Sequence, residues 1–116
     1  MLSVLEKFKI DVNANAQIQR IVKGWNTEIL LEEKDASASY FLDVKDGKID
    51  SVRQFEKGSD PDHQTKIVCD QEIMQGLFEG RVNAIRANND GLLEIYGGMS
   101  DQVKFDAIAI ILWGIC

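Results

Sequence analysis

Apolar residues recur at helical spacing near the start of the chain. Two groups have members three or four positions apart: Leu5, Phe8 and Val12, then Ile18, Ile21, Val22 and Trp25. Asn15 stands between the groups, where an asparagine side chain accepts a hydrogen bond from the first turn of a helix. The spacing predicts two helices, the second beginning after Asn15 and ending near Gly24, since glycine often terminates a helix.

An alternation of apolar and polar residues follows and indicates strands. Ile29 and Leu31 alternate with glutamates, and a second alternating run covers residues 38–44. Asp46-Gly47 is the preferred pair for a type I′ hairpin turn, because glycine tolerates the positive φ that this turn demands. A third strand is expected over 48–55. The alternation predicts an antiparallel meander with one buried face.

The second half of the chain is expected to add helices to this sheet. The pattern predicts a loop over 57–62, a strand from Thr65 to Cys69, a helix between Asp70 and Gly80, a short helix over 82–87, a strand over 91–96, and a last helix capped by Ser100 or Asp101. This order gives an α+β fold with helices packed against one antiparallel-rich sheet. Its 116 residues hold no long linker, which predicts a single domain spanning 1–116.

Charge narrows the classes of partner. Nineteen acidic residues exceed thirteen basic ones, for a net charge of −6. With no basic cluster, we expect no nucleic acid partner and no tight docking on an anionic membrane. The uncharged run over 107–116 is too short to cross a bilayer, so no stable membrane insertion is expected. Glu6 and Asp11 interrupt the N-terminus, unlike a signal peptide, and Cys69 and Cys116 suit free thiols, so the expected location is cytoplasmic.

Candidate chemistry is sparse. His63 with Asp60 and Asp62 has spacing that suits a turn better than a metal site. Cys69 with His63 as its base is disfavoured as a nucleophile, because Cys69 shares the side of its strand with Ile67 and fits a buried thiol. Gly97-Gly98 fits a tight turn better than a phosphate loop. We therefore predict no catalytic residue, no metal and no cofactor, and do not expect an enzyme.

The last helix is apolar on every side. Phe105, Ile108, Leu112 and Ile115 mark one face, and the rest of the helix is largely apolar too. Two interpretations stay open at this point. The first is that the helix is buried in the core, or that its outer face makes a homodimer interface. The second is that it forms the wall of an apolar cavity shared with the helix that holds Ile73 to Phe78.

Several motifs stand in the same order as in a known family. They are Asn13-Ala14-Asn15 through Trp25-Asn26, the turn Lys45-Asp46-Gly47-Lys48, the helix end Leu77-Phe78-Glu79-Gly80-Arg81, and Gly91-Leu92-Leu93-Glu94-Ile95-Tyr96-Gly97. With these motifs, nearly the whole chain resembles the sterol-carrier-protein type (SCP2 sterol-binding) lipid-transfer domain family. The resemblance implies a five-stranded sheet with helices on one face, enclosing an apolar tunnel for lipid.

This resemblance also implies a function without catalysis. The expected ligand is a hydrophobic small molecule: a fatty acyl group, a fatty acyl-CoA or a sterol-like lipid. The expected ligand-binding residues are Trp25, Leu77, Phe78, Val82, Ile85, Ile95, Phe105, Ile108, Ile111 and Leu112, with Trp25 at the mouth, where its ring tolerates a wet edge. The alternative is an interaction module of the same fold with a filled cavity, acting through a homodimer or a larger partner.

Overall fold

The computed structural model describes residues 1–36, 38–56 and 58–114. Its helices are α1 (Leu2–Ala14), α2 (Ala16–Ile21), α3 (Gln71–Glu79), α4 (Ala84–Asn89) and α5 (Met99–Trp113). Its strands are β1 (Thr27–Glu33), β2 (Ala38–Lys45), β3 (Lys48–Glu56), β4 (Thr65–Cys69) and β5 (Leu93–Tyr96). The predicted order of elements is confirmed. The expectations for Lys57 in a loop, Ile115 in the last helix and Cys116 as a free thiol fall outside the described residues.

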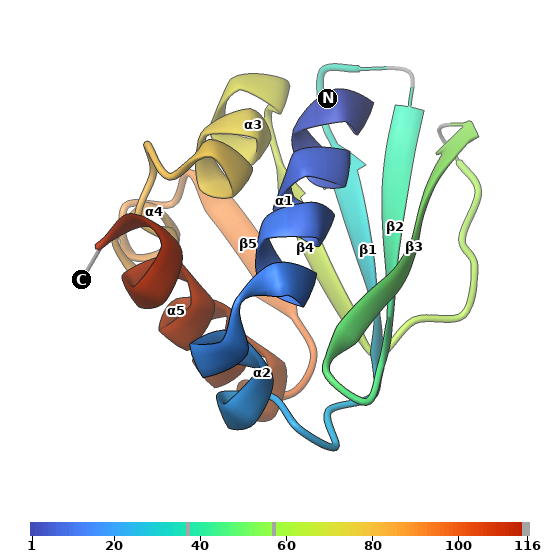
Figure 1. The fold of residues 1–116 in the computed structure, drawn as a ribbon. Helices are drawn as coiled ribbons and strands as arrows, with labels where there is room; N and C mark the ends of the chain where they lie inside the picture. Colours follow the sequence, from blue (N-terminus) through green and yellow to red (C-terminus); the bar gives the residue numbers. More distant parts are fainter. Residues whose placement is uncertain (37, 57, 115–116) are drawn as a thin grey trace.

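The strands form one five-stranded sheet in the order β3-β2-β1-β4-β5. Only the central pair of β1 and β4 is parallel, so the sheet is mostly antiparallel. The helices lie together on one face of this sheet, with α1 crossing it beside α3 and α5 (Figure 1). The predicted fold class, α+β with helices packed on one face of an antiparallel-rich sheet, is confirmed.

The first two helices meet at Asn15. Its side-chain oxygen accepts a hydrogen bond from the Ile18 backbone N–H at 3.0 Å, which makes Asn15 the N-cap of α2 as predicted. The helix is shorter than expected, however, because it ends at Ile21. Gly24 then turns the chain with a φ of 81°. Trp25 therefore lies after the helix, two residues before β1 begins.

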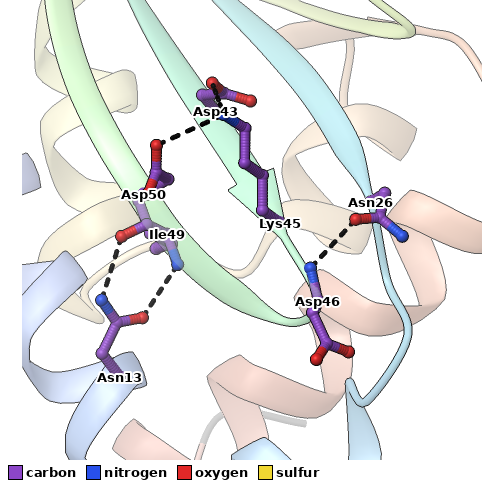
Figure 2. A network of polar contacts seen from close by, with 7 residues as sticks. All are labelled: Asn13, Asn26, Asp43, Lys45, Asp46, Ile49 and Asp50. Atoms are coloured by element: carbon purple, nitrogen blue, oxygen red, sulfur yellow. Dashed lines mark hydrogen bonds and ion pairs between the residues drawn. The ribbon is translucent and has the colours of Figure 1, made fainter.

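The turn between β2 and β3 has the predicted geometry. Asp46 and Gly47 both have positive φ, 50° and 79°, as a type I′ turn requires. Figure 2 shows how side chains hold this region: Asn13 of α1 both donates to and accepts from the backbone of Ile49, at 3.0 and 2.8 Å. Asn26 accepts from the Asp46 N–H at 3.0 Å. The hairpin is thereby tied to α1 and to the start of β1.

The core lies between the inner face of the sheet and the helices. Leu5, Phe8 and Val12 of α1 are buried in it, as their spacing predicts. The expectation of a single buried face was wrong for the central strands, because Leu30 and Phe41 on the outer face are also buried. The Arg53 guanidinium lies 4.8 Å from the centre of the Phe41 ring and covers it.

Helix starts differ from the sequence prediction in their partners. Asp70 occupies the N-cap position of α3, but its side chain makes no capping hydrogen bond, and Asp35 accepts from the Gln71 N–H at 2.7 Å instead. The N-cap of α5 is Gly98, so the expectation that Ser100 or Asp101 caps this helix was wrong. The Asp101 carboxylate is held by other segments of the chain.

Candidate ligand-binding site

A pocket lies between the inner face of the sheet and helices α3, α4 and α5. Its volume is about 120 Å³. The residues that line it are Phe8, Trp25, Ile29, Leu42, Val44, Ile49, Thr65, Ile67, Leu77, Phe78, Ala84, Ile85, Asn88, Leu93, Ile95, Asp101, Gln102, Phe105, Asp106 and Ile108. Most of these side chains are apolar and buried, so the interior suits a hydrophobic molecule.

Three phenylalanines from three helices form an aromatic part of the wall. The Phe78 ring packs edge-on against Phe8, with centroids 5.0 Å apart, and against Phe105, with centroids 5.4 Å apart. Both geometries are favourable for aromatic pairs. They bring α1, α3 and α5 together, so the helices that close the core also shape the pocket.

Asp101 closes one end of the pocket. Its carboxylate accepts hydrogen bonds from the Trp25 indole N–H at 2.7 Å, from the Thr27 hydroxyl at 2.6 Å and from the Thr65 hydroxyl. These donors come from the segment before β1, from β1 and from β4. A buried carboxylate is tolerated when several donors bind it. Trp25 is only 7% exposed, so the expectation of a wet edge at the pocket mouth was wrong.

The pocket reaches the surface between α4 and α5. Its two exposed lining side chains, Ile85 and Asn88, are both on α4, and Gln102 and Asp106 lie half-buried on α5. Burial raises the pKa of the Asp106 carboxyl above its ordinary value. Within the described parts of the chain, the Asn88, Gln102 and Asp106 side chains make no hydrogen bond or ion pair. The opening therefore carries polar groups with unused bonding capacity.

The structure brings most of the predicted ligand-binding residues to this pocket. Those that line it are Trp25, Leu77, Phe78, Ile85, Ile95, Phe105 and Ile108. Val82 lies instead in a small neighbouring hollow with Phe105 and Asp106. Ile111 and Leu112 are partly buried against the core without lining the pocket. For all ten predicted residues, a role in binding a ligand stays a prediction.

Sequence reasoning missed two groups of lining residues. The first is the inner face of the sheet, represented by Ile29, Leu42 and Ile67, whose alternation marked them only as core. The second is the polar set at the opening. Gln102 and Asp106 are four positions apart and so share one face of α5, which was an available signal. The spacing alone, however, does not indicate which other element of the fold this face of α5 lies against.

A second, more polar hollow adjoins the first. Lys23 and Lys104 line it, and among the described residues it shares only Trp25 and Asp101 with the apolar pocket. Because the Trp25 and Asp101 side chains are bonded to each other, they stand between the two hollows. The two lysines therefore border the polar hollow and not the apolar pocket.

Cys69 and His63 do not form a reactive pair. Cys69 is the last residue of β4, and His63 lies two positions before that strand begins, so the strand separates them. Burial, helped by the nearby Glu33 carboxylate, raises the pKa of the Cys69 thiol to about 12. Its sulfur contacts Met74 at 3.9 Å, while the His63 ring lies 2.9 Å from the Pro61 carbonyl oxygen. Cys69 is a buried thiol, as its position beside Ile67 predicted.

The turn at Gly97-Gly98 is tight, as expected. Gly97 has a φ of 137°, and a side chain there would approach the Gln64 carbonyl oxygen to 2.6 Å.

None of the helices in the described part of the chain has the length and apolar character that crossing a bilayer requires.

Comparisons with known structures identify the fold. Sterol carrier protein 2 superposes with a TM-score of 0.70 at 18% sequence identity, covering 94% of this chain and 88% of that one. Palmitated SCP2L2 from Aedes aegypti gives 0.67 at 19% identity, with 91% and 90% covered. Sterol carrier protein 2 from Yarrowia lipolytica, in its apo form, gives 0.60 at 22%, with 94% and 86% covered. The chain has the fold of the SCP2 sterol carrier protein domains, as its motifs predicted.

Sequence comparisons gave no further relationship. No family model matches the chain, and no curated protein matches it. At identities below 25%, the likeness to solved structures concerns the fold. Function has to be argued from the pocket.

Proposed function

We propose that this protein binds a hydrophobic small molecule in the pocket beneath α4 and α5 and carries it without chemical change. One observation carries the proposal: the helices and the sheet enclose an apolar hollow in a chain of this size. The fold it shares with sterol carrier proteins supports the same reading. Fatty acyl groups, fatty acyl-CoA and sterol-like lipids are the ligand classes under consideration. Residues 1–116 would act as one cytoplasmic domain.

Removal of the ligand from water would drive binding. At ~25 cal/mol per Å² of apolar surface, burying about 300 Å² contributes about 7.5 kcal/mol before association costs are subtracted. The cavity of about 120 Å³ is smaller than the ~300–1,000 Å³ of common ligand pockets. A long chain would therefore enter only as the gap between α4 and α5 widens.

Native mass spectrometry of the freshly purified protein is the direct test. We expect a retained species of lipid mass, which solvent extraction then identifies. A protein of apo mass that also fails to take up added long-chain alcohols and fatty acids would contradict the proposal.

Filling the pocket gives the first mutational prediction. Ile108→Trp places a larger ring in the wall, and we expect it to lower affinity for a neutral fluorescent probe such as N-phenyl-1-naphthylamine by tenfold or more. Ala84→Trp does the same from the half-buried edge of α4, in case the first variant folds poorly. Val103→Trp is the control, because Val103 is exposed on α5 and does not line the pocket.

Circular dichroism and thermal unfolding show which of these variants remain folded. The pocket assignment is wrong if folded Ile108→Trp and Ala84→Trp proteins bind the probe as well as the parent does. It is also wrong if Val103→Trp weakens binding to the same extent.

An interaction module remains the second candidate, favoured by exposed apolar side chains on α5. Ile110 is 50% exposed, and Met99 and Val103 are exposed as well. Trp113, which is also on α5, instead stacks on Phe8 within the chain, with centroids 5.8 Å apart. Sedimentation over a range of concentrations tests this candidate: a dimer that Ile110→Glu dissociates would support it.

A further inference from the structure

The charges in the pocket wall are all of one sign. Among the described residues that line it, Asp101 and Asp106 are acidic, and none is lysine, arginine or histidine. In a wall of low polarity, a ligand anion gains no ion pair and meets the repulsion of a like charge. The wall therefore selects against negatively charged ligands before any detail of shape matters.

The Asp101 carboxylate already accepts three hydrogen bonds from within the chain. Trp25, Thr27 and Thr65 all donate to its two oxygens, so its capacity to accept further bonds is largely used. It closes the pocket toward β1 and β4 and separates it from the hollow that holds Lys23 and Lys104. A ligand head group therefore finds no free partner at this end, since reaching either lysine requires breaking that network.

The polar side chains at the α4–α5 opening have no hydrogen-bond or ion-pair partner among the described residues. Asp106 can only accept hydrogen bonds when ionised, whereas the Asn88 and Gln102 amides can donate and accept. A hydroxyl group matches this set, because it donates to the carboxylate while accepting from an amide. A carboxylate or phosphate matches it poorly, because it has nothing to donate and carries a like charge.

We infer that the ligand carries an uncharged, hydroxyl-bearing head group, held at the α4–α5 opening by Asp106, Asn88 and Gln102, and not a carboxylate or phosphate. This inference rests on the proposed function and narrows it: the sterol-like class and long-chain alcohols fit, whereas free fatty acids and fatty acyl-CoA do not. The apolar body of the ligand lies against Phe78 and Phe105, and the head group remains near the surface.

The experiment compares two ligands of equal chain length, 1-decanol and decanoate, as competitors of N-phenyl-1-naphthylamine at pH 8. Decanol should bind more tightly to the parent protein, but that alone is not decisive, because decanoate is also better hydrated. The decisive result is the effect of Asp106→Asn. We expect decanoate affinity to rise about tenfold, the size of a like-charge repulsion at partial burial, with decanol changing by at most about threefold.

Asp90→Asn is the matched control. Asp90 is exposed just after α4 and does not line the pocket, so the same loss of charge should leave both affinities unchanged. Equal gains in decanoate binding from both variants would mean that only net charge matters, and would overturn the inference. So would decanoate binding that equals decanol binding in the parent and falls in Lys104→Gln, since the head group would then occupy the polar hollow.

The outcomes separate the inference from the proposed function. Binding of the probe and of both ligands, with no response to Asp106→Asn, rejects the head-group assignment and leaves the carrier function standing. Failure of the probe and both ligands to bind rejects the carrier function, and the head-group inference with it.

Discussion

Asp101 lies in the first turn of α5, a common place for an acidic residue, and yet its carboxylate does not cap that helix. Its partners are Trp25 and two threonines on neighbouring strands. One side chain thus joins the last helix to β1, to β4 and to the segment before β1. This contact fixes where α5 begins relative to the sheet, and with it one end of the pocket.

Replacing Asp101 tests this role. Asp101→Ala should lower the free energy of unfolding by about 3 kcal/mol or more, because it leaves three buried donors without an acceptor. Chemical denaturation provides the measurement. Asp101→Asn keeps one acceptor oxygen and should cost less, while Asp90→Ala removes an exposed carboxylate and should cost almost nothing. Equal costs for Asp101→Ala and Asp90→Ala would contradict the role assigned to the network.

Gly80 ends α3 and also makes room for the end of α5. Its φ of 83° suits glycine, and a Cβ at this position would lie 2.4 Å from Cγ of Trp113. The close approach lets the indole pack over the end of α3, while its other contacts include Phe8. The lack of a side chain at Gly80 thus allows α3 and α5, which are far apart in the sequence, to pack together.

Gly80→Ala should therefore destabilise the protein through two effects. The positive φ costs about 1–2 kcal/mol, and the overlap with Trp113 adds roughly 1–3 kcal/mol. Gly24→Ala separates the two, because Gly24 has a similar φ of 81° with nothing within 4 Å of its Cβ. Thermal and denaturant unfolding should show the larger loss for Gly80→Ala. If both variants lose the same stability, the Trp113 contact contributes nothing.

The elements were predictable to the extent that local sequence determines them. Asn15, Asp46-Gly47 and Gly80 mark helix and turn boundaries by backbone chemistry that acts within a few residues, and these assignments are confirmed. Asp70 stands at the predicted N-cap position of α3, although its side chain makes no capping hydrogen bond. Asp101 was misread because an acidic residue near a helix start has two possible partners, its own helix or a distant strand. Only the fold decides between these partners.

The same limit applies to the pocket. Leu77, Phe78, Phe105 and Ile108 were placed in a shared wall, and they line the pocket together. Ile111 and Leu112 have the same apolar character but pack elsewhere, because the direction of a helix face depends on how the helix is docked. Periodicity identifies a buried face, whereas a hollow exists only where neighbouring side chains fail to fill the space.

At the scale of the molecule, one buried carboxylate sets a pH dependence of stability. Glu33 is 1% exposed, and among the described residues neither of its oxygens has a hydrogen-bond partner. Burial is the main cause that raises its pKa. The N-terminal amine lowers this pKa, and Asp35 raises it. The Tyr40 hydroxyl and the Cys69 thiol nearby have raised pKa values too, so neither adds a second negative charge beside Glu33 at neutral pH.

The folded state therefore favours the protonated form of Glu33. Its contribution to stability is full below the pKa of an unfolded glutamate and is lost as pH rises through the raised pKa of the folded state. Glu33→Gln removes this dependence, so it should stabilise the protein by about 1–3 kcal/mol at pH 8 and by less at pH 4. Denaturation at both pH values is the measurement, with exposed Glu72→Gln as the control. A gain that does not depend on pH would show that Glu33 is not the titrating group.

The helix α5 follows all the strands in the chain, although Phe105 and Ile108 form part of the inner wall. During synthesis the sheet, α1 and α3 therefore emerge from the ribosome before α5. Until α5 follows, one side of the apolar pocket is open, and the Trp25 indole lacks its acceptor, the Asp101 carboxylate. During that interval the nascent chain exposes apolar surface that is buried in the folded protein. Chaperones and other nascent chains can bind this surface. Completion of the pocket by α5 thus coincides with the burial of this apolar surface.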